Sequence, residues 1–317
     1  PMHLFDRLGL PVIGVPIVNY DNSQHSHNEN LRVGHFWRGI ETYAALLARS
    51  SDRAARFAGL GLRCGDLVLM QLPNTIEFVV SYLALNMLGV IPVMALRAHR
   101  QAEVRHFLRA SGAAAYLIPD IVGGFDFRVM AGQMQAEFNA LKHVLVAGEP
   151  APGQLALSRL PDAPAPVAGP RPADVSTMLL SGGTTSLSKL IPRTHDDYVR
   201  NVRLCGAAAG FSERTVLMAI LPLGHNYNLA SPGMLGAFYH GGTVVIASGT
   251  SVEEVFSLVQ RERVTVIAAV VPLITTWLNS GALAAYDLSS LAVVQNGGAR
   301  LAPELRRRLR QQLACTP

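Results

Sequence analysis

The chain has 317 residues, half of them apolar, and a formal net charge of +5. This composition excludes a disordered chain, the scattered basic residues form no nucleic-acid-binding patch, and neither a membrane span nor a signal peptide is evident. The three cysteines lie far apart, so we expect a cytoplasmic globular protein of two or three packed units that binds neither nucleic acid nor membrane.

Residues 1–40 lack a clear periodicity, and we expect them to form a loosely ordered N-terminal arm. From Glu41 on, helical periodicity alternates with short apolar runs. The expected helices are 41–58, 73–87 and 103–111, and the expected strands are 66–72, 90–96, 114–118 and 143–147. This alternation predicts a parallel sheet covered by helices on both faces, so residues 41–147 are expected to form a first α/β subdomain.

Residues 148–173 are rich in Pro, Ala and Gly and are predicted to be a linker. A second α/β subdomain is expected over 174–317. Its expected strands are 175–180, 215–221, 243–247, 264–270 and 291–295, and its expected helices are 195–209, 229–239, 251–262, 272–279 and 301–310. Two doubly wound, largely parallel subdomains flanked by helices would place a ligand crevice at the carboxyl ends of their strands.

The most informative stretch runs from Ser181 to Lys189 and reads SGGTTSLSK. It follows an apolar strand, and its glycines permit a tight turn whose backbone N–H groups can face an anion. Hydroxyl side chains add donors and Lys189 adds a positive charge, which suits a polyphosphate. The spacing differs from that of a Walker loop, and for this stretch alone a plain surface turn is an equal alternative.

Three further stretches follow, which read PRTHDDY at 192–198, HNYNLASPG at 225–233 and QNGGAR at 295–300. Together with the loop, and in this order, they resemble the adenylate-forming superfamily of acyl- and aryl-AMP ligases, and most of all its aryl-acid-activating branch. The resemblance covers the chain from about Tyr43 to its end. It implies ATP-dependent activation of an aromatic carboxylic acid, such as 2,3-dihydroxybenzoate or salicylate, to an aryl-AMP with release of pyrophosphate.

The resemblance also implies roles for single residues. The phosphates of ATP would be held by Ser181, Gly182, Gly183, Thr184, Thr185, Ser186 and Lys189. The acid would be bound by Asn226, Tyr227, Ser231 and Asn296, and adenine would lie against Gly297, Gly298, Ala299 and Arg300. Lys189 and His225 are the candidate catalytic residues, with a hydrogen-bonded core histidine as the alternative for His225. The LPN step at 72–74 resembles an early family motif and is expected to serve packing rather than chemistry.

Two positions depart from the family pattern. Ser186 stands where the loop usually has Gly, and a side chain there narrows the backbone freedom of the loop. Asn296 stands where the family commonly has an apolar residue on the pocket floor. Because a buried amide needs a partner, Asn296 predicts an additional hydrogen-bonding group on the substrate.

The cofactors implied by the resemblance are ATP and Mg²⁺. The family's magnesium-binding glutamate, its ribose-binding aspartate and its C-terminal lid domain with a catalytic lysine all belong after Pro317. No metal ligand is therefore expected within this chain, and the chain alone is expected to have little or no adenylation activity.

Three functions stay open. The first is an aryl-acid–AMP ligase that passes its product to the phosphopantetheine thiol of an aryl carrier protein, in siderophore or nonribosomal peptide assembly. The second is an acyl-CoA ligase of the same fold. The third is a truncated, non-catalytic module that only binds nucleotide or acid. The HNY stretch at 225–227 favours the first.

Overall fold

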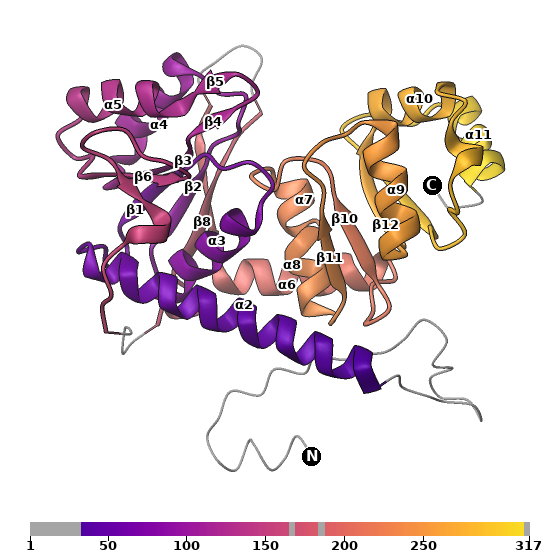
Figure 1. The fold of residues 1–317 in the computed structure, drawn as a ribbon, viewed down its shortest axis with the longest axis horizontal. Helices are drawn as coiled ribbons and strands as arrows, with labels where there is room; N and C mark the ends of the chain where they lie inside the picture. The colour runs from indigo at the N-terminus through magenta and orange to yellow at the C-terminus, as the bar shows by residue number, and fades with distance from the viewer. Residues whose placement is uncertain (1–32, 165–168, 183–187, 314–317) are drawn as a thin grey trace.

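A computed structural model describes residues 33–164, 169–182 and 188–313 (Figure 1). The helices of the first half are α2 (Val33–Gly59), α3 (Ile76–Leu88), α4 (Gln101–Ser111) and α5 (Phe127–Glu137). Its strands are β1 (Leu67–Met70), β2 (Ile91–Met94), β3 (Ala115–Pro119), β4 (Ile121–Val122), β5 (Phe125–Asp126), β6 (His143–Ala147), β7 (Leu155–Ala156), β8 (Val175–Leu180) and β9 (Leu190–Thr194). A 3-10 turn, η1 (Leu157–Arg159), follows β7.

The second half has helices α6 (His195–Ala208), α7 (Asn226–Ala230), α8 (Gly233–Tyr239), α9 (Val252–Glu262), α10 (Val271–Asn279) and α11 (Pro303–Leu313), and the 3-10 turn η2 (Leu283–Ala285). Its strands are β10 (Val216–Ala219), β11 (Thr243–Ile246), β12 (Val266–Val270) and β13 (Val293–Gly297).

Two sheets organise the molecule. The first has seven strands in the order β7-β6-β3-β1-β2-β8-β9, all parallel except β9, which runs antiparallel to β8. The second has four parallel strands in the order β11-β10-β12-β13. The largely parallel α/β fold expected from the sequence is therefore confirmed, and it directs the carboxyl ends of the strands within each sheet toward one edge.

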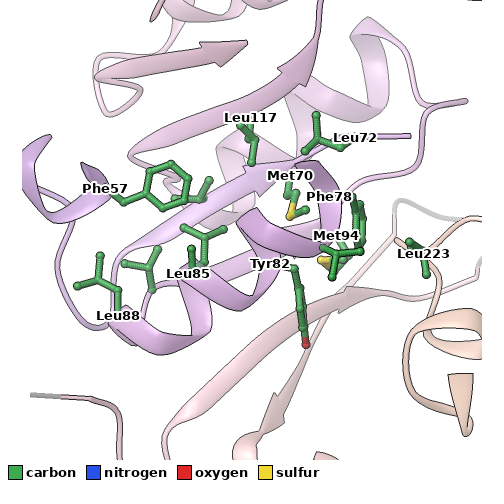
Figure 2. Close-up of a cluster of buried hydrophobic side chains, with 14 of the residues drawn as sticks. Phe57, Met70, Leu72, Phe78, Tyr82, Leu85, Leu88, Met94, Leu117 and Leu223 are labelled. Atoms are coloured by element: carbon green, nitrogen blue, oxygen red, sulfur yellow. The ribbon is translucent and has the colours of Figure 1, made fainter. Parts of the chain in front are cut away.

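The buried clusters show five layers in the order helices, sheet, helices, sheet, helices. The outer face of the first sheet packs on α4 and α5, and the outer face of the second sheet packs on α9, α10 and α11. Between the sheets lies a cluster that draws side chains from α2, α3, α6, α7 and α8. Figure 2 shows its part around α3, with Phe57 of α2 nearby. In this cluster Leu223, which follows β10, packs together with Phe78 and Tyr82 of α3. The two halves of the chain thus share one hydrophobic core.

Helix α2 runs along both halves (Figure 1). Near its start the Tyr43 hydroxyl donates to the carbonyl of Gly242, 2.9 Å away, and near its end Phe57 is fully buried in the shared core. Helix α3 shows how local sequence sets the ends of an element. The Thr75 side chain accepts from the backbone N–H of Phe78 at the start, and Gly89 takes the left-handed conformation at the end, with φ of 74°.

The structure differs from several sequence-based boundaries. Strand β8 at 175–180 was expected in the second subdomain. It pairs in parallel with β2 and therefore belongs to the first sheet. That stretch is no simple linker, since it contains β7 and η1. Residues 33–40 of the predicted arm are helical, and the helix expected over 229–239 is two helices separated at Ser231-Pro232. The sequence reading missed β4, β5, α5 and β9.

Candidate functional site

The predicted phosphate loop connects β8 to β9 at the carboxyl end of β8. Its two ends are joined, since the N–H of Ser181 donates to the Lys189 carbonyl at 2.9 Å and the N–H of Lys189 donates to the Ser181 hydroxyl at 2.8 Å. Gly182 and Lys189 are exposed. Gly183, Thr184, Thr185 and Ser186 lie outside the described residues. The structure therefore shows the base of the loop as a closed hairpin with an exposed cation beside it.

The imidazole Nε2 of His106, on α4, lies 2.8 Å from the carbonyl oxygen of Ser188, at the exit of the loop. This contact ties the hairpin to a helix on the outer face of the first sheet. His106 carries no signal in the sequence, because a lone histidine in a helical stretch does not indicate a contact 82 residues away along the chain.

The predicted acid-binding residues gather at the start of α7. Asn226 Oδ1 accepts from the hydroxyl of Tyr198 at 3.3 Å, and Asn226 Nδ2 donates to the hydroxyl oxygen of Ser231 at 3.0 Å. His225 caps the helix, because its Nδ1 accepts from the backbone N–H of Tyr227 at 3.2 Å. We refer to Asn226, Tyr227 and Ser231 as the acid wall. The structure places Asn226 against Ser231, with Tyr227 next to it in the chain, and their role in binding an acid stays a prediction.

The acid wall also meets the predicted adenine-binding turn. A methyl group added at Gly297 would lie 2.8 Å from Cε1 and Cζ of the Tyr227 ring, so only a glycine permits this approach. The next residue, Gly298, is exposed and left-handed, with φ of 81°, and nothing lies within 4 Å of its missing side chain. Ala299 and Arg300 are exposed as well. The turn after β13 is thus a thin, open backbone edge beside an aromatic ring.

Asn296 does not lie on the Tyr227 side of this turn. Side chains alternate along β13, and Val294 is buried on the outer face of the second sheet, in the cluster with α9, α10 and α11. Asn296 shares that face with Val294, whereas Gly297 is on the face that meets Tyr227. The Asn296 Nδ2 group donates to the Ala299 carbonyl at 2.6 Å. The alternation of the strand thus favours the outer face for Asn296, and its place on the pocket floor stays a prediction.

Asn74 connects the two halves at this edge. Its Nδ2 donates to the carbonyls of Ala219 and Leu221, at 3.2 and 2.9 Å, and its Oδ1 accepts from the N–H of Leu223 at 2.8 Å. These bonds fix the backbone that leads from β10 to His225. The packing role expected for the LPN step is thus a set of hydrogen bonds that the sequence pattern alone could not assign to a partner.

A cavity of about 230 Å³ opens between the carboxyl edges of the two sheets. Its lining comes from the segments that follow β1, β2, β10 and β11, including Asn74, Leu96 and Gly224. Gly224 is close to the first sheet, because a methyl group there would lie 3.3 Å from the Ala95 carbonyl oxygen. The acid wall therefore begins where the second sheet meets the end of β2, and β2 is the neighbour of β8, which carries the phosphate loop.

Burial controls the protonation of the side chains around the wall. It raises the pKa of Tyr227 to about 12, and it raises the pKa of Tyr198 far above the usual range of a phenol. Burial also lowers the pKa of His195, against the opposing effects of Asp174 and Asp196. Both phenols are therefore protonated near neutral pH and can act as hydrogen-bond donors.

Within the described ranges, no group of three His, Cys, Asp or Glu side chains could hold a metal ion. We accordingly assign no step to the Mg²⁺ that the resemblance implies. None of the described helices is long and apolar enough to cross a membrane.

Comparison with known proteins identifies the family. Residues 27–317 match the AMP-binding enzyme family. The chain is 43% identical over 275 residues to 2,3-dihydroxybenzoate-AMP ligase of Bacillus subtilis, covering 87% of this chain and 51% of that protein. It is 42% identical over 286 residues to the salicyl-AMP ligase / salicyl-S-ArCP synthetase of Mycobacterium tuberculosis, covering 89% of this chain and 50% of that protein.

Solved structures of related proteins have the same fold. The apo structure of Mycobacterium smegmatis MbtA superimposes with a TM-score of 0.78 at 38% identity, covering 86% of this chain and 50% of that chain. An anthranilate CoA ligase, AuaEII, shares the fold with a TM-score of 0.79 at 22% identity, over 86% of this chain and 52% of that one. The chain spans about half the length of the curated relatives it matches. On the match of residues 27–317 and on these relatives, the chain belongs to the AMP-binding enzyme family, among the adenylate-forming ligases.

Proposed function

We propose that this protein uses ATP to activate an aromatic carboxylic acid with an ortho-hydroxyl group, forming an aryl-AMP and pyrophosphate. The observation that carries the proposal is the approach of the Tyr227 ring to Gly297, with the Asn226 amide beside it. An aromatic ring can stack on a flat acid, an amide N–H can donate to a phenolic oxygen, and the open backbone edge at Gly298 leaves room for adenine.

In the reaction a carboxylate oxygen attacks the α-phosphorus of ATP. A new P–O bond forms, the bond to the β-phosphate oxygen breaks, and pyrophosphate leaves with the electron pair. The protein has to hold two anions together, which it does by positioning and by cationic and N–H donors. We assign the binding of the triphosphate to the loop between β8 and β9. Ser181, Gly182 and Lys189 form the base of this loop, and the other proposed phosphate-binding residues are Gly183, Thr184, Thr185 and Ser186.

His225 has a role as a donor in this proposal. Its Nδ1 accepts from the N–H of Tyr227, so the proton of the neutral imidazole is on Nε2. That Nε2–H group, on an exposed side chain at the start of α7, is available to a carboxylate or phosphate oxygen. The remaining assignments are Asn226, Tyr227 and Ser231 for the acid, and Gly297, Gly298, Ala299 and Arg300 for adenine. ATP is the cosubstrate, and Mg²⁺ accompanies it by resemblance.

The thiol that receives the aryl group distinguishes two versions of the proposal. One relative is named salicyl-AMP ligase / salicyl-S-ArCP synthetase, and another, 37% identical over 290 residues and covering 87% of this chain, is named salicylyl-CoA synthase / salicylate adenylyltransferase. We favour an aryl carrier protein as the acceptor, with a role in siderophore or nonribosomal peptide assembly. Incubation of the intact enzyme with salicylate, ATP and either a carrier protein or coenzyme A separates the two, because the preferred thiol will be acylated faster.

Calorimetric titration of the 317-residue chain tests the proposal directly. We expect binding of salicylate and 2,3-dihydroxybenzoate, weaker binding of benzoate, and binding of a non-hydrolysable ATP analogue. We also expect little or no ATP–pyrophosphate exchange by this chain alone, since relatives of about twice its length carry the activity in their names. Failure to bind any aryl acid would contradict the proposed substrate, and appreciable exchange would contradict the expected inactivity.

A further inference from the structure

Tyr198 touches the acid wall from a different part of the chain. It lies in the first turns of α6, directly after β9, and only 4% of its surface is exposed. Its hydroxyl donates to Asn226 Oδ1 at 3.3 Å. Helix α6 is held in place beside α7, because Asn201 Nδ2 donates to the Ala230 carbonyl at 2.5 Å. Tyr198 is therefore a buried phenol with a fixed approach to the amide of the acid wall.

The surroundings of the phenol determine which way it donates. Burial keeps the Tyr198 hydroxyl protonated, and the Arg193 guanidinium lies over its ring, 5.7 Å from the centroid. The neighbouring buried hydroxyl of Tyr82 is already bonded to the Thr177 hydroxyl at 3.0 Å. The Thr177 hydroxyl also lies close enough to interact with Tyr198, and Asn226 Oδ1 accepts the hydrogen bond that the Tyr198 hydroxyl donates. A buried hydroxyl without an acceptor would be unfavourable.

This donation determines the orientation of the Asn226 amide. With Oδ1 facing Tyr198, Nδ2 faces Ser231 and gives one hydrogen to the Ser231 oxygen. The second Nδ2 hydrogen and the hydroxyl hydrogen of Ser231 are then both left for a ligand. Asn226 and Ser231 are each half-buried rather than closed off by the protein. On the proposed function, these two groups are the donors that a substrate would meet.

We propose that Tyr198 is a positioning residue that holds the Asn226 amide with its donor side toward the substrate, so that the pocket selects an ortho substituent that accepts a hydrogen bond over one that donates. The inference rests on the function proposed above. It deepens that function by defining the substrate class as 2-hydroxy acids and excluding 2-amino acids of the same shape.

Salicylate and anthranilate differ in whether the ortho substituent accepts a hydrogen bond from the wall or donates one to it. In salicylate the phenolic proton bonds to the molecule's own carboxylate, so the oxygen presents only lone pairs to the wall. In anthranilate one N–H bonds to the carboxylate and the other N–H points outward, toward the Asn226 Nδ2 donor. Two donors facing each other leave both groups without an acceptor, which disfavours binding.

The experiment compares binding of salicylate, anthranilate and benzoate to the 317-residue chain by calorimetry. For the unmodified chain we expect salicylate to bind at least about tenfold more tightly than anthranilate. Tyr198→Phe keeps the ring and removes the donor, so the Asn226 amide can rotate and accept the outward N–H of anthranilate. The salicylate-to-anthranilate ratio should then fall by roughly five- to tenfold, with benzoate affinity unchanged.

Tyr116→Phe is the matched control, because it removes an equally buried hydroxyl that bonds to Gln71 in the first half of the chain rather than to Asn226. It should leave the ratio as in the unmodified chain. Thermal unfolding of both variants reports whether each is folded at the titration temperature. Loss of discrimination in both variants, or a Tyr198→Phe ratio equal to that of the unmodified chain, overturns the inference alone. Absence of aryl-acid binding by the unmodified chain overturns the proposed function as well, so the two failures are distinct.

Discussion

The acid wall and the phosphate loop are built in different ways. Asn226 is fixed by side chains from separate segments, Tyr198 of α6 and Ser231 after α7, and the Tyr227 ring rests against Gly297. Lys189 is fixed only through its backbone, by two hydrogen bonds to Ser181, and its side chain makes no ion pair with the described residues. The wall therefore relies on tertiary packing for its geometry, whereas the base of the loop relies on a local hairpin.

On the proposed function, this contrast reflects the different demands that the two kinds of ligand place on the chain. A neutral phenolic group is recognised by donors whose direction is fixed in a partly dry site, which needs support from distant elements. A polyphosphate is recognised by exposed cations and N–H groups, whose strength depends on charge. Substitutions can test whether the difference is real.

The largest effect is expected for Asn74→Ala. Three hydrogen bonds between the halves are lost, which should lower the free energy of unfolding by about 2–4 kcal/mol. Urea denaturation measures the change, with Asn139→Ala as control, because Asn139 is an exposed asparagine. We expect a loss of salicylate affinity together with the loss of stability. Equal stability of the two variants would show that Asn74 does not support the acid wall.

Gly297→Ala should disrupt the acid wall and leave the phosphate loop unchanged. The added methyl would lie 2.8 Å from the Tyr227 ring and displace it, so salicylate affinity should fall at least about tenfold. Binding of inorganic tripolyphosphate, which has no adenine, should change little. Gly132→Ala is a matched control, since its nearest neighbour, Gln154 Nε2, is at an ordinary distance of 3.8 Å. Unchanged salicylate affinity in Gly297→Ala would place the aromatic acid elsewhere.

Lys189→Ala should have the opposite pattern. We expect roughly tenfold weaker binding of the ATP analogue and unchanged salicylate affinity, because only a cation of the loop is removed. The difference in nucleotide affinity between Lys189→Ala and the unmodified chain should become smaller as the salt concentration rises from about 50 to about 500 mM, because salt screens exposed charges. Lys142→Ala, at another exposed lysine, is the control. A fall in salicylate affinity equal to the fall in nucleotide affinity would contradict the separation of the two regions.

The smallest effect is expected for Asn296→Val. Since β13 turns this residue away from Tyr227, the order of affinity among salicylate, 2,3-dihydroxybenzoate and 3-hydroxypicolinate should not change. The stability should change by no more than about 1 kcal/mol, because the lost bond from Nδ2 is offset by removal of an Oδ1 that is buried without a partner among the described residues. An altered order would restore Asn296 to the acid pocket.

Periodicity predicted most of the parallel strands and the helices between them. Strands β6 and β8 were predicted with the bounds that the structure has, because each contains consecutive apolar residues, Val144–Val146 in β6 and Met178–Leu180 in β8. Very short elements were missed, such as β4, β5 and β7, since two residues carry no period. Strand β9 was missed because an exposed, proline-containing edge strand lacks the apolar signal that buried strands have.

By itself, the sequence determined the fold class, the family and the order of the candidate loops, because apolar period and loop chemistry are local properties of the chain. It also singled out Asn226, Tyr227 and Ser231 as candidate acid-binding residues. The tertiary structure decided which sheet β8 joins, which face of β13 carries Asn296, and that Tyr198 bonds to Asn226 while Asn74 bonds to the backbone of Leu223. These contacts join residues 28 to 149 positions apart, and pairing over such separations depends on how the two sheets pack rather than on any local pattern.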